Sequence, residues 1–137
     1  MTQVLELKPL AITAEEYFKA KLAYEMTPYS LKALLIDKNT TACGMSAKDV
    51  LVLDVRSTEA FNESHIPGAL NIPLADLAGK LTTLPKDKTL VTYCSSLTCA
   101  LAPKAALKLA EAGFKVMEMY GGFATWTQYG FPVEKKA

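Results

Sequence analysis

The stretch Thr89-Leu-Val-Thr-Tyr-Cys94-Ser-Ser-Leu-Thr-Cys99-Ala100 places a cysteine between an apolar segment and a run of helix-forming residues. The β-branched and aromatic residues at 91–93 predict a short buried strand. From Ala100 to Ala112 the sequence is rich in Ala, Leu and Lys, and Gly113 follows, which predicts a helix that ends there. Cys94 therefore lies in a loop that leads from a strand into a helix.

This position suggests a chemical role for Cys94. Backbone N–H groups of the loop can surround its sulfur, and the positive end of the helix dipole faces it. Both effects favour the thiolate, which is the nucleophilic form of cysteine. The alternative is an ordinary cysteine at the end of a strand, because free cysteine is commonly buried. This stretch alone leaves both interpretations open.

The composition is that of a small globular protein. The chain has 137 residues, of which 50% are hydrophobic and 21% charged, with a net charge of +1. This length suits one domain with a single core. No basic cluster exceeds the Lys135-Lys136 pair, so no nucleic-acid partner is expected. No apolar run reaches the roughly 20 residues that span a bilayer, so no membrane partner is expected.

The beginning of the chain and its cysteine count predict a cytoplasmic protein. Residues 1–8 show no basic segment followed by an apolar stretch, so no signal peptide is expected. Three cysteines, an odd number, make a poor disulfide framework. A reducing cytoplasm is the natural compartment for such a chain.

Helix and strand patterns alternate along the sequence. Thr13 and Glu16 form a capping box that predicts a helix to about Glu25, and Thr27-Pro28 begins a second helix. Further helices are predicted at 57–63, 76–81, 100–112 and after Gly121-Gly122, strands at 50–54, 70–72, 89–93 and 115–119, and a loop at 39–49. This alternation predicts an α/β fold in which helices flank a parallel sheet, with ligands bound at the carboxyl ends of its strands.

A set of short motifs then follows in order: Leu53-Asp-Val-Arg56, Glu59 with Phe61, His65-Ile-Pro-Gly-Ala69, Asn71-Ile-Pro73, Tyr93-Cys94, Ala106-Leu107 with Leu109, Gly113-Phe114, and Gly121-Gly122 before Trp126. Together they resemble the rhodanese, or sulfurtransferase, homology domain. The resemblance runs from about Ser30 to Val133. It implies a three-layer α/β fold with a central parallel sheet of about five strands. Residues 30–137 would form the rhodanese-like domain, and residues 1–29 an N-terminal helical extension.

The resemblance also implies an activity. Cys94 would accept a sulfane sulfur from thiosulfate, a persulfide or a polysulfide, and would pass it as a persulfide to a thiophilic acceptor. That acceptor would be a small thiol, a cyanide-like anion or a protein thiol, and no cofactor or metal is implied. The residues carried over are Cys94 as nucleophile, Ser95, Ser96, Leu97, Thr98, Cys99 and Ala100 as the sulfur-binding loop, and Asp54 and Arg56 as supporting residues.

The loop departs from many active members of the family. Leu97 stands three residues after the cysteine, where they have glycine, and residues 95–100 contain no Arg or Lys. Because leucine resists positive φ, a different loop shape is expected. A loop without a cation offers little attraction for a doubly charged anion such as thiosulfate. This favours a less charged donor, such as an organic persulfide, a polysulfide or a protein thiol.

Two other functions are weighed. A phosphatase of the same fold needs Cys-X5-Arg to clamp phosphoryl oxygens, and the arginine position here is Ala100, which argues against it. A non-catalytic or redox-sensing interaction module that uses Cys94 and Cys99 stays open. In that case the Cys99 thiol attacks an oxidised or persulfidated Cys94 and leaves a disulfide. The alternative interpretation of Cys99 is a small residue that fills the first turn of the helix.

The supporting residues are interpreted mainly as structural. Asp54 is expected to bond backbone near the Cys94 loop, and Arg56 to pair with Glu59 or Glu63. The other conspicuous side chains, interpreted as structural or incidental, are His65, Phe123, Trp126 and Cys43.

Overall fold

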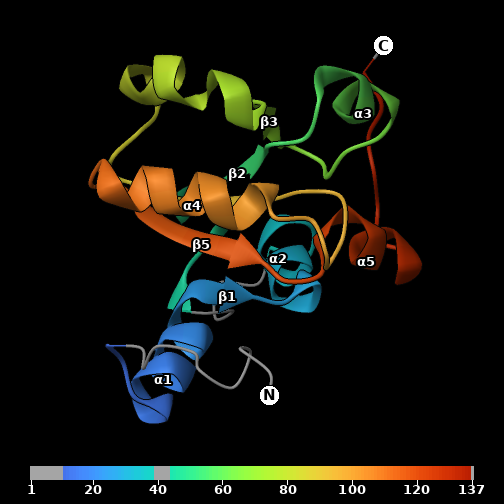
Figure 1. Cartoon of the computed structure of the whole chain (residues 1–137). Helices are drawn as coiled ribbons and strands as arrows, with labels where there is room; N and C mark the ends of the chain where they lie inside the picture. Colours follow the sequence, from blue (N-terminus) through green and yellow to red (C-terminus); the bar gives the residue numbers. More distant parts are fainter. Residues whose placement is uncertain (1–10, 39–43, 137) are drawn as a thin grey trace, which may run out of the picture.

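Five parallel strands form one sheet in the computed structural model, which describes residues 11–38 and 44–136. The strand order is β1-β5-β4-β2-β3, and every neighbouring pair is parallel (Figure 1). The strands are β1 (Glu25–Met26), β2 (Val50–Asp54), β3 (Leu70–Asn71), β4 (Thr89–Tyr93) and β5 (Lys115–Met119). The predicted α/β fold with a parallel sheet of about five strands is confirmed.

Helices cover both faces of the sheet. They are α1 (Ala14–Tyr24), α2 (Pro28–Leu35), α3 (Thr58–Glu63), α4 (Leu101–Glu111) and α5 (Gly122–Gln128), with 3₁₀ helices η3 (Ala47–Asp49) and η4 (Leu74–Thr83). One core cluster lies between the sheet and α4 with η4, and the other between the sheet and α2 with α5. Among the helices of the described residues, none combines the length and apolar composition that crossing a bilayer requires.

The central strands are buried on both faces, as continuous apolar runs predict for parallel strands. Leu53 and Leu90 belong to the cluster under α4, whereas Val52 and Val91 belong to the cluster under α2 and α5. The side chains of β2 and β4 therefore fix two helical layers at once. Cys94 belongs to the cluster on the α4 side, so the same packing that builds the core also positions its sulfur.

Three elements differ from the predictions. Residues 25–26 form the edge strand β1, whose pairing with β5 brings Glu25 opposite Glu118 and Met26 opposite Met119. The predicted helix at 76–81 is a 3₁₀ helix that spans Leu74–Thr83, and the predicted loop at 39–49 ends in the 3₁₀ helix η3. The segment expected to be a helical extension thus contributes a strand to the sheet.

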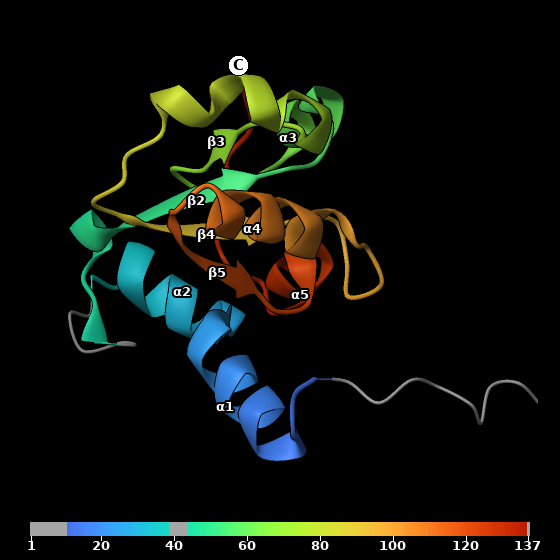
Figure 2. The same ribbon diagram turned by 60° about the vertical axis from the view of Figure 1, so that its left-hand side comes forward.

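Helix α1 stands apart from the rest of the molecule. None of its residues is buried, and Leu22 is 84% exposed, while Figure 2 shows the helix extending away from the sheet. The predicted capping box is present: the Glu16 N–H donates to Thr13 Oγ1 at 3.1 Å, and the Thr13 N–H donates to Glu16 Oε1 at 2.9 Å. Local hydrogen bonds, more than core packing, define where this helix begins.

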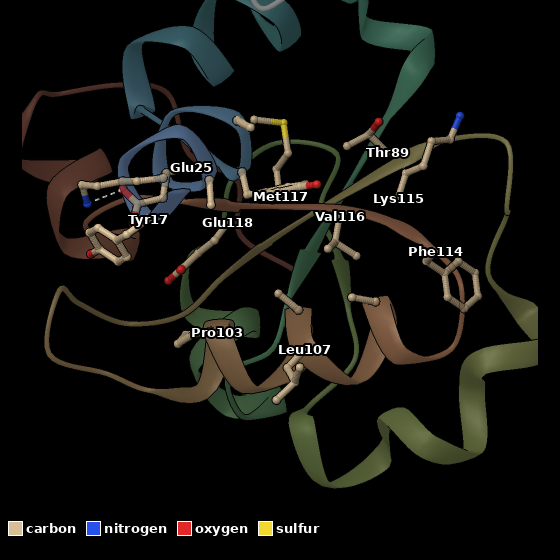
Figure 3. A pocket seen from close by; sticks show the side chains of 16 residues that line it. Tyr17, Glu25, Thr89, Pro103, Leu107, Phe114, Lys115, Val116, Met117 and Glu118 are labelled. Carbon is tan, nitrogen blue, oxygen red and sulfur yellow. Dashed lines mark hydrogen bonds and ion pairs between the residues drawn. The ribbon is translucent and has the colours of Figure 1, made fainter. Parts of the chain in front are cut away.

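A hollow of about 770 Å³ separates α1 from α4. Figure 3 shows it between α4, which contributes Leu107, and β5, which contributes Val116 and Glu118, with Tyr17 of α1 at one end. Burial in this hollow, together with the nearby Glu25 charge, raises the pKa of Glu118. Neither Cys94 nor residues 95–100 line the hollow, so it is distinct from the cysteine loop.

Candidate active site

Cys94 lies immediately beyond the carboxyl end of β4. The Val55 N–H donates to the Tyr93 carbonyl at 3.1 Å, which extends the hydrogen bonding between β2 and β4 just past the end of β2. The cysteine is only 2% exposed and packs among the buried residues between the sheet and α4. Its sulfur is therefore at the floor of the loop and not on the outer surface.

The loop that follows folds back on itself in a tight turn. The Cys99 N–H donates to the Ser96 carbonyl at 3.1 Å, and the hydroxyls of Ser96 and Thr98 lie 3.3 Å apart. Leu97 is 62% exposed. Among the described residues, Lys38 is the only non-glycine residue with positive φ, so the turn forms without a left-handed residue at 97.

The start of α5 holds the carbonyl side of this loop. The Phe123 N–H donates to the Cys94 carbonyl at 2.7 Å, and the Ala124 N–H donates to the Ser95 carbonyl at 2.8 Å. These N–H groups belong to the first turn of a helix and have no partner within it. Two otherwise unpaired donors of α5 thus fix the backbone that carries the sulfur.

Gly122 makes this contact possible. Its φ is +69°, and a Cβ atom there would lie 2.6 Å from the Ser96 nitrogen and 2.8 Å from the Cys94 carbonyl oxygen. Any side chain would therefore push the loop away from α5. From the sequence, Gly121-Gly122 was expected only to precede a helix. The feature that could have indicated the contact of Gly122 with the Cys94 loop is its position just after β5, the strand beside β4.

The start of α4 faces the sulfur from the other direction. Its N-cap, Ala100, makes no side-chain capping hydrogen bond, and Pro103 has no N–H. The N–H groups of Leu101 and Ala102 lie near the two cysteine sulfurs and act to lower their pKa values. The buried Thr92 hydroxyl donates to the Ala102 carbonyl at 3.0 Å and ties this turn to β4.

Two thiols share this site. The Cys94 Sγ donates to the Cys99 carbonyl at 3.4 Å, and the two thiols are near enough for each to shift the pKa of the other. Cys99 is half-buried and precedes α4, which begins at Leu101. Cys99 therefore lies just before the first helical turn, where one interpretation had placed it, and its carbonyl accepts from Cys94 across the loop.

The two thiols differ in acidity. Burial, reinforced by the hydrogen bond to Cys99, raises the pKa of Cys94 to about 11, and the N–H groups of Ala102 and Ser96 only partly oppose this. Partial burial acts to raise the pKa of Cys99, but the hydrogen bond from Cys94 and nearby N–H groups lower it. The sequence-based prediction that the loop favours the Cys94 thiolate is wrong for the resting protein, because desolvation outweighs the helix dipole.

A pH dependence follows from this shift. A raised thiol pKa leaves little thiolate near neutrality, so alkylation of Cys94 by iodoacetamide should be slow at pH 7. Its rate should increase about tenfold per pH unit between about pH 8 and 10. Peptide mass spectrometry of the quenched reaction measures this rate at Cys94. In the urea-unfolded chain the rate should level off above about pH 9; the same plateau in the folded protein would contradict the raised pKa.

Asp54 and Arg56 form a buried network behind the site. Asp54 is fully buried, and its Oδ2 accepts from Arg56 Nη2 at 2.6 Å and from the Tyr93 hydroxyl at 2.6 Å. The Tyr93 hydroxyl also accepts from the Ile66 N–H at 3.1 Å. A charged pair with this many hydrogen bonds rigidifies the carboxyl edge of β2 and β4.

This arrangement corrects the expected partner of Arg56. Arg56 pairs with Asp54 and donates to the Ser64 carbonyl, and none of its ion pairs or hydrogen bonds in the described structure involves Glu59 or Glu63. The Asp54 carboxylate accepts from a backbone N–H, that of Arg56 at 2.9 Å, and also from the Arg56 guanidinium and the Tyr93 hydroxyl. The guanidinium carbon of Arg56 lies 4.4 Å from the centroid of the Phe123 ring. Arg56 thus supports the residue whose N–H holds the Cys94 carbonyl.

The remaining conspicuous side chains lie in structural positions. The His65 Nδ1 is 2.8 Å from the Phe61 carbonyl, and its ring stacks on Phe61. Trp126 is fully buried, and its Nε1 donates to the Pro132 carbonyl at 2.8 Å. Cys43 lies outside the described residues.

Comparison with known proteins places this geometry in a family. The sequence model of the rhodanese-like domain matches residues 27–129. The chain is 34% identical over 80 residues to the thiosulfate sulfurtransferase GlpE of Coxiella burnetii, which covers 58% of this chain and 73% of that protein. It is 40% identical over 91 residues, 66% of this chain, to the HTH-type transcriptional regulator Rv0324 of Mycobacterium tuberculosis. The matched stretch spans 40% of that regulator's own length.

A solved structure agrees with these relatives. The crystal structure of the BH2092 protein from Bacillus halodurans is 35% identical and superposes with a TM-score of 0.76, covering 89% of this chain and 84% of that one. The family match covers most of the chain, and both the motif order and the parallel sheet agree with it. The chain belongs to the rhodanese-like domain family.

Proposed function

We propose that this protein is a sulfurtransferase that moves a sulfane sulfur from a donor to a thiophilic acceptor through a persulfide on Cys94. The observation that carries this proposal is the Cys94 thiol at the carboxyl end of β4, enclosed by N–H groups of the loop and of α4. Relatives named as sulfurtransferases support the same chemistry. We further propose that it works in a reducing compartment such as the cytoplasm, which keeps both thiols reduced.

The proposed reaction has two displacements. The Cys94 thiolate attacks the sulfane sulfur of the donor, the bond between that sulfur and the rest of the donor breaks, and the donor leaves with the electron pair. An acceptor nucleophile then attacks the outer sulfur of the persulfide, and Cys94 leaves as thiolate. Fixed N–H groups stabilise negative charge on sulfur in both steps, so no cofactor is needed. Asp54 and Arg56 act as positioning residues.

A direct test measures sulfur transfer to cyanide. With glutathione persulfide as donor and cyanide as acceptor, the protein should form thiocyanate well above the uncatalysed background. The product is coloured with ferric iron, so the initial rate is easily followed. Thiocyanate formation equal to the background at every pH tested, by protein that retains its fold, would reject the proposal.

The entrance of the site indicates the class of donor. Residues 95–100 include no cation, Leu97 is exposed at the loop, and the guanidinium of Arg56 is buried against Asp54. Attraction for an anion would therefore come mainly from backbone dipoles, which are weaker at a distance than a free cation. We therefore propose an organic persulfide, a polysulfide or a protein persulfide as donor in preference to thiosulfate.

Donor preference is a measurable consequence. At matched ionic strength, kcat/KM for an organic persulfide without carboxylates should exceed that for the doubly charged thiosulfate by about tenfold or more. Leu97→Arg, a change at an exposed position, should raise kcat/KM for thiosulfate more than for the persulfide, and added salt should weaken that gain. A higher efficiency with thiosulfate in the wild type would contradict the proposed donor class.

A second candidate function is a redox-sensing interaction module. The contact between Cys94 and Cys99 favours it, because two adjacent thiols can form a reversible disulfide. The similarity to a protein named as a transcriptional regulator is a second observation in favour of a regulatory role. A Cys94 that takes up no sulfur from any donor, yet forms a disulfide with Cys99, would favour this alternative.

A further inference from the structure

We propose that Cys99 is an internal acceptor: its sulfur attacks Sγ of persulfidated Cys94, hydrosulfide leaves, and a Cys94–Cys99 disulfide remains. This inference rests on the proposed persulfide on Cys94 and adds a second activity at the same site. In the absence of an outside acceptor, the protein converts sulfane sulfur into hydrosulfide, and a dithiol supplies the electrons.

The first argument is the distance between the two side chains. The Cys94 Sγ donates to the Cys99 carbonyl at 3.4 Å, and the two thiols are near enough for each to shift the pKa of the other. No segment has to move across the site to bring them together. We expect rotation of the two side chains within this loop to bring the sulfur atoms to bonding distance.

The second argument is that both sulfur atoms are surrounded by the same loop. A single peptide segment therefore supplies donors to the nucleophile and to the sulfur that it attacks. The donors alternate along the chain: the N–H groups of Ser96 and Ala102 face Cys94, and those of Ser95 and Leu101 face Cys99.

The third argument is the fixed backbone on either side of the pair. The Cys94 carbonyl is held by the Phe123 N–H at 2.7 Å, and the Cys99 N–H is held by the Ser96 carbonyl at 3.1 Å. The spacing of the two cysteines is thus set by the fold, which lowers the entropic cost of their reaction. A cysteine at this point of the loop meets Cys94 whenever the loop is folded.

The acidity of the groups decides which sulfur Cys99 attacks. Attack on the outer sulfur would expel the Cys94 thiolate, a slower leaving group than hydrosulfide because burial raises the pKa of this thiol to about 11. Attack on Sγ expels hydrosulfide, which is less basic than an alkyl thiolate and leaves more readily. Cys99 also supplies the more abundant thiolate, since its own pKa is lowered. The preferred product is therefore a disulfide and not a persulfide on Cys99.

The atoms and electrons of this step balance. The Cys99 thiolate forms the new S–S bond with Sγ of Cys94, and the bond between Sγ and the outer sulfur breaks. The outer sulfur takes the electron pair and its proton away as hydrosulfide, so it is reduced while the two cysteines are oxidised to a disulfide. An external dithiol then reduces this disulfide by exchange and returns both thiols.

The test uses the full chain with Cys43→Ser, so that only the two site thiols remain. Reduced protein is mixed with one equivalent of glutathione persulfide and no reductant, and intact mass and free sulfide are followed. With Cys99 present, the mass should fall by about 2 Da as one equivalent of sulfide appears. With the additional change Cys99→Ser, the mass should rise by about 32 Da, and sulfide release should be at least about tenfold slower.

Controls separate this inference from the proposed function. Cys99→Ala, which lacks the serine hydroxyl, should behave like Cys99→Ser. If the protein with both thiols also keeps a stable gain of about 32 Da, Cys99 is no acceptor, although the Cys94 persulfide stands. If no variant gains that mass and no disulfide forms, the persulfide chemistry itself fails. A gain of about 32 Da that maps to the Cys99 sulfur would show attack on the outer sulfur and overturn the inference.

Discussion

Cys94→Ser is expected to abolish thiocyanate formation from glutathione persulfide, with a loss of at least about a thousandfold. Serine has no sulfur to carry the transferred atom, and its hydroxyl is far less acidic than a thiol. In the Cys99→Ser background, the same change should also abolish the gain of about 32 Da. Thermal unfolding should change little, because a serine hydroxyl is smaller than a thiol and can still donate to the Cys99 carbonyl.

The matched control for this experiment is Cys43→Ser. It removes a thiol that the proposal does not use, and so both turnover and the mass change should persist. Turnover that survives in Cys94→Ser, with the sulfur found on Cys99 instead, would transfer the role of nucleophile to the second thiol. A loss of unfolding cooperativity in Cys94→Ser would assign the cysteine a packing role as well.

Gly122→Ala is expected to have the second largest effect. The residue has φ +69°, and its new Cβ would lie 2.6 Å from the Ser96 nitrogen and 2.8 Å from the Cys94 carbonyl oxygen. Since both contacts are to backbone, the loop and α5 must separate. We expect a loss of about 3 kcal/mol in the free energy of unfolding, from the strained φ and the overpacking together. Sulfur transfer should fall by about a hundredfold, because misplacement of the reacting atoms by about 1 Å has effects of this size.

Gly130→Ala is the matched control for Gly122→Ala. Its φ is +73°, but nothing lies within 4 Å of the added Cβ, so it carries the cost of the backbone conformation without the contact. It should lose about 1 kcal/mol in the free energy of unfolding and keep sulfur transfer. Urea unfolding and initial rates measure both quantities. Equal losses of transfer in the two variants would mean that contact with the loop does not matter.

Much of the fold was predictable because its signals are local. The apolar runs of β2 and β4, the capping box at Thr13 and Glu16, and Pro28 at the start of α2 all lie where the sequence places them. Strand β1 was not predictable in this way. It has two residues, too few for a pattern, and it exists because Glu25 and Met26 pair with β5 nearly a hundred residues away in sequence.

The candidate site was predicted in position but not in detail. The sequence places Cys94 between β4 and α4, and the structure agrees. The acidity of that thiol was predicted in the wrong direction, because a dipole can be read from the chain whereas the depth of burial cannot. The partner of Arg56 was also predicted wrongly, because the sequence offers carboxylates at 54, 59 and 63 and only the structure shows that Asp54 lies 2.6 Å from the guanidinium.

The missing cap of α4 has a consequence for how this protein can evolve. At Ala100, a serine or aspartate would typically add about 1 kcal/mol of helix stability by accepting from the first N–H groups. The same substitution would place a competing oxygen beside the donors that face the sulfur atoms. Stability and activity therefore make opposite demands on one position. Selection for a more robust helix alone would move the chain toward a well-capped domain with a weaker cysteine site.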